Sequence, residues 1–317
     1  MGFETCPHGG GVEAAARRWC CNPDDVLDLS TGLHPAGPPA WLGTWLQQQS
    51  DLIGRYPDAH GEPARTALAK AFAVPAANVL MIAGAQAMIE IIFHAMSWQS
   101  LAIRTPCYRE PLRCAQRAGC HIRSYAMYET IPAADAVWMT SPSNPFGDQQ
   151  ALPLNRGGVL DESYMAFAQR RNLGLLPQWV RLGSLTKTFC IPGLRLGYVI
   201  AESRTIEALM RWLPPWPATT LGLHLLPLLL PEADERDRQL QQGCQRLDAL
   251  LLSHGWQTHR SAASFVLGRP PHPLPDPAKH RLLLREFPEW PALSHSVRLG
   301  IPAGEIGWQR LKEYLKP

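Results

Sequence analysis

The sequence has 317 residues, of which 46% are hydrophobic and 18% charged, so it can form one large domain or two of ordinary size and is typical of a compact globular protein. Thirty Lys and Arg residues against 27 Asp and Glu residues give a net charge of +3. This charge is too small and too scattered for a nucleic-acid-binding surface, so no nucleic acid is expected among the partners.

The start of the chain, MGFETCPHGGG, has no positively charged residues followed by an apolar core, so we expect no secretory signal. The longest apolar stretch, 221–230, contains His224 and Pro227 and is about half as long as a membrane-spanning helix. The cysteines include no C-x-x-C pair, which predicts reduced thiols and no metal site. These features predict a cytoplasmic protein without a membrane partner.

A helix is predicted to begin after Gly84, because Ile89, Ile92, Phe93 and Met96 recur at helical spacing and form one apolar face. The glycine and the small residues that follow it leave backbone N–H groups at the helix start, where they can bind an anion. A plain turn from strand to helix explains the same pattern equally well.

Short apolar runs of strand length alternate with helical patterns through the middle of the chain. The predicted strands cover residues 100–104, 121–125, 136–140, 158–160, 180–183 and 196–201, and a helix at 110–118 lies between the first two. This alternation predicts an α/β domain with a largely parallel sheet, helices on both of its faces and a site at the carboxyl ends of the strands.

The character of the sequence changes after about residue 205. Pro214, Pro215 and Pro217 interrupt the chain, a long helix is predicted over 232–254, and an extended loop follows at 270–277. We therefore predict a large domain over residues 36–210 and a smaller domain formed by residues 1–35 together with 211–317.

Lys187 ends the run Ser184-Leu185-Thr186-Lys187, and Arg195 follows eight residues later. A lysine in a partly dry pocket can form an imine with an aldehyde, because desolvation and neighbouring charge lower its pKa. Ser184 and Thr186 offer hydroxyl donors to a phosphate, and Arg195 offers a planar fork of donors. The combination is typical of a pyridoxal phosphate site, although a lone S-x-x-K more often marks an ordinary solvated lysine.

The order of these motifs along nearly the whole chain resembles the fold-type I pyridoxal phosphate enzymes, the aspartate aminotransferase superfamily. Within it the sequence is similar to the branch that contains histidinol-phosphate aminotransferase and, closer still, looks like the threonine-phosphate decarboxylases of cobalamin biosynthesis. The resemblance implies a large domain with a mostly parallel sheet flanked by helices, a smaller α+β domain, pyridoxal 5′-phosphate as cofactor and a homodimer with shared active sites.

The resemblance also implies roles at the cofactor. Lys187 would be the Schiff-base lysine, and Asp161 would keep the pyridine nitrogen protonated, so that the ring acts as an electron sink. Asn144 and Tyr164 would bind the phenolic oxygen. The remaining residues would be Tyr108, stacked on the ring, Ala85, Gln86, Ser184, Thr186 and Arg195 at the phosphate, and Tyr56, which would reach the phosphate bound by the partner subunit. Without the resemblance, Asp161 is more often a helix N-cap and Asn144-Pro145 a turn signal.

Both ends of the chain match residues that bind substrate in the family. His8, Gly9 and Gly10 would help to bind a phosphorylated substrate, because glycine permits close backbone approach and histidine adds a donor. In isolation, a histidine near a terminus is more often solvated. Arg285 and Arg298 would bind the phosphate and the carboxylate of the substrate respectively, and Asn144 would also lie near the substrate.

The sequence departs from the family pattern in two places. Only 13 residues separate Gly147 from Asp161, where the family has a longer insertion with a helix, so we expect a thinner flank of the sheet there. Gly32, in Ser30-Thr31-Gly32, lies at the substrate-side position where the decarboxylases have an asparagine, and this removes one side-chain contact.

The sequence therefore predicts the decarboxylation of L-threonine O-3-phosphate to (R)-1-amino-2-propanol O-2-phosphate in cobalamin biosynthesis. The alternative is a histidinol-phosphate-type aminotransferase, which uses nearly the same residues, and His8-Gly9-Gly10 favours the decarboxylase. A third hypothesis is a cofactor-binding dimer without catalysis that acts as an adaptor or regulator. The presence of Arg285 and Arg298 makes it the least favoured of the three.

Overall fold

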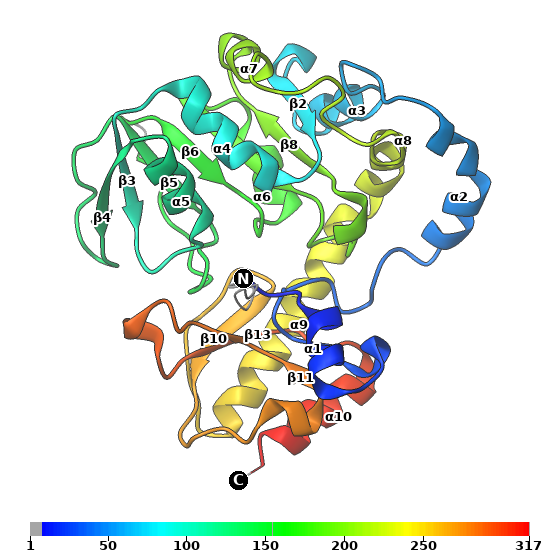
Figure 1. Cartoon of the computed structure of the whole chain (residues 1–317), viewed down its shortest axis with the longest axis vertical. Helices are drawn as coiled ribbons and strands as arrows, with labels where there is room; N and C mark the ends of the chain where they lie inside the picture. Colours follow the sequence, from blue (N-terminus) through cyan, green and yellow to red (C-terminus); the bar gives the residue numbers. More distant parts are fainter. Residues whose placement is uncertain (1–7, 154, 317) are drawn as a thin grey trace. The chain divides into compact units, whose positions relative to one another are not determined.

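A computed structural model describes residues 8–153 and 155–316. The predicted absence of a secretory signal concerns the start of the chain, of which residues 1–7 lie outside the described residues. The chain forms two compact units (Figure 1). The larger unit consists of Pro38–Asn144 and Gln149–Asp237, and the smaller unit consists of Met1–Gly37, Pro145–Asp148 and Arg238–Pro317.

The larger unit contains a seven-stranded sheet in the order β2-β8-β7-β6-β5-β3-β4 (Figure 1). The strands are β2 Val79–Ile82, β3 Ser100–Arg104, β4 His121–Tyr125, β5 Ala136–Thr140, β6 Gly158–Asp161, β7 Trp179–Ser184 and β8 Gly197–Ile200. Strand β8 runs antiparallel to β2 and β7, and the other described neighbours are parallel. The prediction of a largely parallel sheet is confirmed.

Helices pack on both faces of this sheet, because successive residues of each buried strand point to opposite sides. In β2, Val79 and Met81 belong to a core with α3 and α8, whereas Leu80 and Ile82 belong to a core with α4 and α7. The helices of this unit are α2 Leu42–Gln48, α3 Ala64–Ala71, α4 Ala85–Met96, α5 Glu110–Arg117, α6 Phe167–Leu173, α7 Ser203–Met210 and α8 Thr220–Leu229.

The boundary between the units falls after Asp237, whereas the sequence indicated a boundary after residue 210. Helix α8 accounts for the difference. Its Leu223, Leu225 and Leu226 are buried in the same core as α3, so the segment that follows the prolines still belongs to the larger unit.

The smaller unit contains a four-stranded antiparallel sheet in the order β12-β13-β10-β9 and a separate parallel pair, β1 and β11. Its strands are β1 Leu27–Asp28, β9 Gln257–Thr258, β10 Phe265–Arg269, β11 Leu282–Leu283, β12 Arg285–Glu286 and β13 Val297–Gly300. Its helices are α1 Val12–Trp19, most of α9 Ala233–Ser253, and α10 Gly304–Tyr314. Leu247, Leu299 and Leu311 form the centre of its core.

Short 3-10 turns connect many of these elements. They lie at Pro23–Asp25, Ser50–Gly54, Ala76–Asn78, Pro192–Leu194, Leu230–Glu232, Pro277–His280 and Pro291–Leu293. No described helix combines the length and the apolar character that a membrane crossing requires, and the described cysteines are thiols.

Candidate functional site

The start of α4 forms a cradle with Arg195. Gly84 joins β2 to this helix with φ +83°, a conformation that glycine adopts at little cost. A side-chain carbon placed on Gly84 would lie 2.6 Å from Nη2 of Arg195, so the guanidinium lies directly against the helix start. The first N–H groups of a helix have no partner inside the helix, and they carry its positive dipole end. With the cation beside them, the residues Ala85 and Gln86 at this start suit a phosphate.

Two hydroxyls lie at the carboxyl end of β7. Oγ of Ser184 and Oγ1 of Thr186 are 2.8 Å apart, and the amide of Thr186 donates to Oγ of Ser184 at 3.3 Å. Both residues are buried, and the next residue, Lys187, is half-buried. The predicted phosphate donors and the predicted lysine thus follow directly from one buried strand.

Asp161 ends β6, the strand next to β7, and is only 7% exposed. One of its oxygens accepts hydrogen bonds from the amide of Ser163 at 3.0 Å and from its hydroxyl at 2.6 Å. Burial raises the pKa of Asp161 although these two bonds lower it. Among the described residues, no lysine or arginine forms an ion pair with Asp161, so a cation beside it would stabilise the ionised carboxylate.

One predicted aromatic residue, Tyr164, lies near Lys187, and another, Tyr108, is bound to Gln86. Its Nζ is 5.8 Å from the centroid of the Tyr164 ring. The hydroxyl of Tyr108 donates to Oε1 of Gln86 at 2.6 Å, and Nε2 of Gln86 donates to the buried Glu110 at 3.2 Å. Burial and the charge of Glu110 raise the pKa of Tyr108. The Tyr108 ring is therefore held in one orientation as a neutral phenol.

Two other predicted residues lie differently. Tyr56 is 78% exposed and stacks on Trp216, with the ring centroids 4.3 Å apart. Asn144 lines a small cavity behind Tyr108. The structure thus brings Asn144 near the residues described above, whereas Tyr56 presents its ring to the surface.

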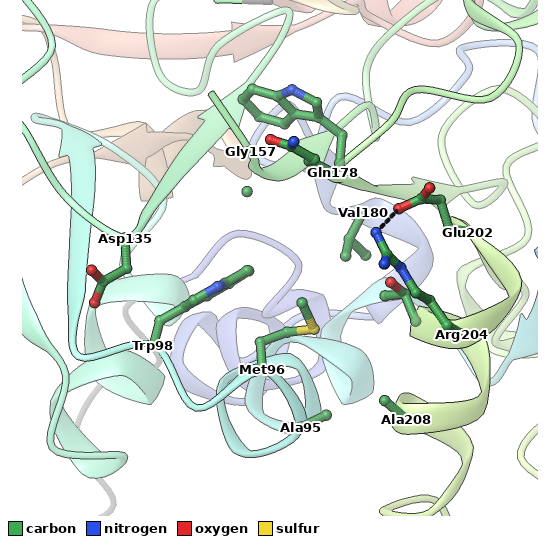
Figure 2. Close-up of a pocket in the computed structure, with 13 residues that line it drawn as sticks. Ala95, Met96, Trp98, Asp135, Gly157, Gln178, Val180, Glu202, Arg204 and Ala208 are labelled. Atoms are coloured by element: carbon green, nitrogen blue, oxygen red, sulfur yellow. Dashed lines mark hydrogen bonds and ion pairs between the residues drawn. The ribbon is translucent and has the colours of Figure 1, made fainter. Parts of the chain in front are cut away.

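A cavity of about 470 Å³ lies elsewhere in the larger unit (Figure 2). It is lined by Trp98, Asp135, Gly158 and Arg204 among others, at the amino ends of β5, β6 and β7. Arg204 pairs with Glu202 at 2.9 Å on its rim. None of the predicted site residues lines it, because all of those in the sheet lie at the opposite ends of the strands.

In the smaller unit, Arg285 on β12 is directly opposite Arg298 on β13. Residues opposite each other in an antiparallel pair project on the same face, and like charges there are destabilising unless an anion is present. Arg298 is 4% exposed, donates to the carbonyl of Ser30 and lies over the Phe265 ring at 4.5 Å. The two predicted substrate arginines are therefore neighbours.

Glu289 forms an ion pair with Arg285 that the sequence reasoning missed. Arg285 also donates to the carbonyl of Glu286 at 2.7 Å. The second oxygen of Glu289 is buried without a hydrogen-bond partner among the described residues. The spacing of four residues between an arginine and a glutamate is the sequence signal that could have indicated the pair. An anion that binds Arg285 must compete with Glu289.

The glycines of the N-terminal segment pack closely on Ser30. A side-chain carbon on Gly9 would lie 2.4 Å from the carbonyl oxygen of Ser30, and the amide of Gly10 donates to its hydroxyl at 2.8 Å. Gly32 has φ +66°, and a side-chain carbon there would lie 3.0 Å from Oγ of Ser264. The backbone therefore disfavours a larger side chain at Gly32. The half-buried His8 precedes this cluster.

The residues of the larger unit fit the pyridoxal phosphate that the sequence implies. Gly84 and Arg195 form a cradle that a side-chain carbon would fill, and the hydroxyls of Ser184 and Thr186 belong to the same unit. The buried Asp161, with its raised pKa, suits a partner that carries a positive charge, as a protonated pyridine does. Sequence reasoning missed Ser163, which the Asp-x-Ser pattern of an Asx turn could have indicated.

Comparison with known proteins gives three findings. A family model described as aminotransferase class I and II matches residues 24–286. A threonine-phosphate decarboxylase from Pseudomonas aeruginosa is 30% identical over 96% of this chain and 95% of its own length, and a histidinol-phosphate aminotransferase from Pyrococcus furiosus is 24% identical over 81% and 80%. A histidinol-phosphate aminotransferase from Sinorhizobium meliloti, solved in complex with pyridoxal-5′-phosphate, superposes with a TM-score of 0.83 at 17% identity and covers 99% of this chain and 97% of that chain. The predicted fold is confirmed.

Proposed function

Since the chain belongs to the aminotransferase class I and II family of pyridoxal phosphate enzymes, we propose that it decarboxylates L-threonine O-3-phosphate to (R)-1-amino-2-propanol O-2-phosphate. The observation that carries the proposal is the direct pairing of Arg285 with Arg298 across two antiparallel strands. Its similarity to threonine-phosphate decarboxylases supports the choice of reaction.

Two arginines at opposite positions of paired strands favour a substrate with two anionic groups. Each can bind a carboxylate or a phosphate through two parallel hydrogen bonds, which fixes the orientation as well as the charge. Threonine phosphate carries both groups. We assign the phosphate to Arg285 and the carboxylate to Arg298, with His8 and the close-packed Gly9 as further contacts of the phosphorylated substrate.

The residues of the larger unit would hold the cofactor. When bound, pyridoxal phosphate supplies a ring that withdraws electrons from the α-carbon of the substrate. Asp161 keeps the ring nitrogen protonated, Tyr108 stacks on the ring, and Asn144 and Tyr164 donate to its phenolic oxygen. Lys187 attaches the cofactor through its amine. Ala85, Gln86, Ser184, Thr186 and Arg195 bind the phosphate.

The proposal also covers the oligomeric state of the enzyme, its pathway and its location in the cell. Tyr56 and Trp216 form an exposed aromatic stack, and a homodimer would bring Tyr56 to the phosphate bound by the partner subunit. The product would enter cobalamin biosynthesis, and the protein would be cytoplasmic. Sedimentation of the purified protein tests the dimer, and Tyr56→Phe tests the shared phosphate site through the dissociation constant of the cofactor.

The product formed from threonine phosphate tests the reaction. Purified enzyme with pyridoxal phosphate should release carbon dioxide and an aminopropanol phosphate in equal amounts. If histidinol phosphate and 2-oxoglutarate instead yield glutamate, the aminotransferase alternative replaces the proposal. If no amino acid phosphate changes the absorption spectrum of the bound cofactor, the third hypothesis, a cofactor-binding adaptor or regulator without catalysis, is favoured.

The attachment of the cofactor has a separate test. Lys187→Ala should remove the yellow absorption band of the covalently attached cofactor and abolish turnover. Lys70→Ala, an exposed lysine near the end of α3 in the same unit, is the matched control and should keep both. A Lys187→Ala enzyme with an unchanged band would overturn the assignment of Lys187.

The role of Arg285 can be tested through its counter-ion. If Arg285 binds the substrate phosphate, Glu289→Gln should lower the KM for threonine phosphate. The phosphate then no longer competes with the Glu289 carboxylate for Arg285. The effect on kcat should be smaller. A higher KM in Glu289→Gln would show that Glu289 supports substrate binding, and it would contradict the assignment of the substrate phosphate to Arg285.

A further inference from the structure

Four buried charged groups lie behind the strand ends that carry Asp161 and Lys187. Arg170, Arg181 and Glu162 are completely buried, and Asp237 is nearly so. Burial of a charge is unfavourable unless the charge is paired and hydrogen-bonded. The group contains two cations and two carboxylates, so its charges balance without a ligand.

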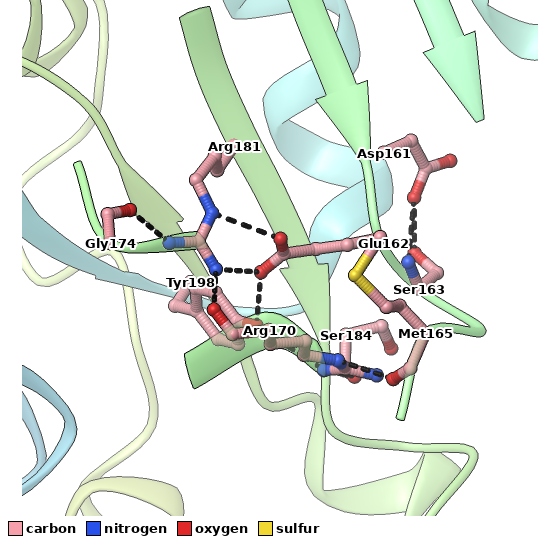
Figure 3. Close-up of polar contacts among 9 residues, drawn as sticks. All are labelled: Asp161, Glu162, Ser163, Met165, Arg170, Gly174, Arg181, Ser184 and Tyr198. Carbon is pink, nitrogen blue, oxygen red and sulfur yellow. Dashed lines mark hydrogen bonds and ion pairs between the residues drawn. The ribbon is translucent and has the colours of Figure 1, made fainter. Parts of the chain in front are cut away.

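Glu162 and Arg181 form an ion pair within this group, and Arg181 also donates to the carbonyls of Gly174 and Arg170 (Figure 3). Nε of Arg181 is 3.0 Å from one oxygen of Glu162, and Nη2 is 3.2 Å from the other. The hydroxyl of Tyr198 also donates to Glu162. Figure 3 shows Glu162 and its neighbour Asp161 pointing to opposite sides of the strand end. Glu162 directly follows Asp161 in the chain, so these contacts fix the backbone next to Asp161.

Arg170 makes a different set of contacts, because it binds the backbone of two separate segments. Nε donates to the carbonyl of Met165 at 2.6 Å, and Nη1 donates to the carbonyl of Ser184 at 3.0 Å (Figure 3). Met165 directly follows Tyr164 in the loop after β6, and Ser184 is the last residue of β7. One side chain thus ties together the segments that carry Asp161 and Lys187.

Asp237 makes the complementary link on the carboxyl side of Lys187. Its two oxygens accept from the amide of Phe167 at 2.5 Å and from the hydroxyl of Thr188 at 3.1 Å. Phe167 begins α6, the helix that carries Arg170. Lys187 therefore lies between Ser184, whose carbonyl accepts from Arg170 on α6, and Thr188, whose hydroxyl donates to Asp237 on α9.

We infer that Arg170 is a positioning residue of the cofactor site, which sets the separation of Asp161 from Lys187 by bridging the carbonyls of Met165 and Ser184. Because Arg170 is completely buried, it acts through these carbonyls and does not touch cofactor or substrate. The inference rests on the roles proposed above for Asp161 and Lys187 and is independent of the substrate.

The guanidinium is specifically suited to this bridge. Its planar fork presents several N–H donors at fixed angles, so it can satisfy two carbonyls in different directions. A lysine ammonium keeps the charge that balances Asp237 and Glu162, but its single nitrogen lies at a different place from both Nε and Nη1. Arg170→Lys should therefore keep the charge balance of the core and lose the bridge.

Arg170→Lys and a control, Arg171→Lys, test the inference without substrate. Arg171 is the next residue of α6 and pairs with Asp234 at the surface. Melting of the apo-enzyme shows whether each variant folds. The two readouts are the dissociation constant of pyridoxal phosphate and the pH midpoint of the bound cofactor's absorption band, which depends on where Asp161 and Lys187 lie.

In folded Arg170→Lys we expect the dissociation constant to rise about tenfold or more, as for other residues that orient direct ligands, and the pH midpoint to move. Arg171→Lys should leave both unchanged. A folded Arg170→Lys enzyme with both readouts at their wild-type values would overturn the inference. If Lys187→Ala also keeps the attached band, the assignment of the lysine has failed instead.

Tyr198→Phe provides the test if Arg170→Lys does not fold. It removes a hydroxyl that lies 3.3 Å from Nη1 of Arg170 and leaves the guanidinium in place. The pH midpoint of the bound cofactor's band should then move away from its wild-type value, because Nη1 of Arg170, which donates to the carbonyl of Ser184, loses its contact with the Tyr198 hydroxyl. An unmoved midpoint in Tyr198→Phe would overturn the inference.

Discussion

The two edges of the seven-stranded sheet differ in what they offer a ligand. The carboxyl edge carries Asp161, Ser184 and the segment with Lys187, which are held by short hydrogen bonds. The amino edge carries the cavity of about 470 Å³, with Trp98 and Asp135 on its walls. The larger volume therefore lies at the edge without the predicted chemical groups.

In this protein the candidate site coincides with the edge that has supporting contacts, and not with the edge that has the larger open volume. At the carboxyl edge, a second layer formed by Glu162, Arg170 and Arg181 holds the strand ends in place. Asp135 at the amino edge accepts from the amides of Gln99 and Ser100 at 2.9 Å, which fixes the start of β3. This is a structural use of a carboxylate, so the two edges can be compared by matched substitutions.

The largest effect is expected when the charge is removed at the carboxyl edge. Asp161→Asn should lower kcat with threonine phosphate by about 10²-fold or more, the range found when one preorganised electrostatic partner is lost. The amide keeps the shape of the side chain but cannot hold the proton on the ring nitrogen. Steady-state kinetics at saturating cofactor measures the loss.

Asp135→Asn is the matched control for this experiment at the amino edge. Its amide can still accept a hydrogen bond through its oxygen, so we expect kcat to stay within about twofold of the wild-type value. Equal losses in Asp161→Asn and Asp135→Asn would show that the two edges are not functionally distinct.

A smaller effect is expected at the start of α4. Gly84→Ala places a methyl group 2.6 Å from the Arg195 guanidinium, which must then move away from the helix start. We expect the dissociation constant of pyridoxal phosphate to rise about tenfold, which corresponds to about 1.4 kcal/mol. Equilibrium titration of the apo-enzyme with cofactor measures it.

Gly119→Ala separates backbone strain from the contact with Arg195. Gly119 has φ +73°, close to that of Gly84, and a side-chain carbon there would meet nothing within 4 Å. An alanine in the left-handed helical region costs about 1–2 kcal/mol in stability. At Gly84, whose ψ of 151° lies in a region that is almost exclusive to glycine, an alanine costs about 1–3 kcal/mol. Cofactor affinity should fall in Gly84→Ala alone. An equal fall in both variants would contradict the role of the cradle formed by the start of α4 and Arg195.

The sequence predicted six of the seven strands of the larger unit, because most of them are buried apolar runs bounded by polar residues, prolines or glycines. The buried strand β2 was not predicted, and β4 was predicted although most of its residues are exposed. Strands β3, β4 and β5 begin and end at the predicted residues. The two-residue strands β1, β9, β11 and β12 were not predicted, since two residues cannot establish a periodic pattern. Helix α8 was not predicted either, because its Pro227 interrupts the helical signal.

The candidate site was most directly predictable where its residues share one motif. Ser184, Thr186 and Lys187 lie within four positions of one another, and a resemblance can identify them together. The contact of Arg195 with Gly84, by contrast, depends on sheet order, which brings β2 beside β8. Arg170 carried no signal, because an arginine in an amphipathic helix is most often a surface residue.

A still smaller effect concerns the stability of the apo-enzyme. Burial raises the pKa of Asp161 above its usual value of 3.8, so the folded protein binds this proton more tightly than the unfolded chain does. The ionised group therefore lowers the free energy of unfolding, by an amount that grows as pH rises from about 3.8 through the raised pKa. Below that range the contribution disappears.

Asp161→Asn should for this reason make the apo-enzyme more stable at pH 7 while it lowers kcat. Thermal melts from pH 4 to 8 should show the melting temperatures of variant and wild type diverging as pH rises, by about 2–4 °C for each kcal/mol. With saturating cofactor the order should reverse, because the bound cation stabilises the carboxylate of the wild type. A variant less stable than wild type at every pH would contradict the raised pKa.

The smallest effect is expected inside the cavity at the amino edge. Arg204 is mostly exposed and pairs with Glu202, so Arg204→Ala should change stability by no more than about 0.5 kcal/mol. Cofactor affinity and kcat should both stay within about twofold of wild type, since the substitution is separated from Asp161 by the length of β6 and leaves Arg170 and Arg181 in place. Calorimetry and cofactor titration of Arg204→Ala measure the two quantities. If instead the affinity for cofactor falls tenfold, the cavity is coupled to the carboxyl edge through the strands. The positions of Met165 and Ser184, which Arg170 binds, must then depend on both edges of the sheet.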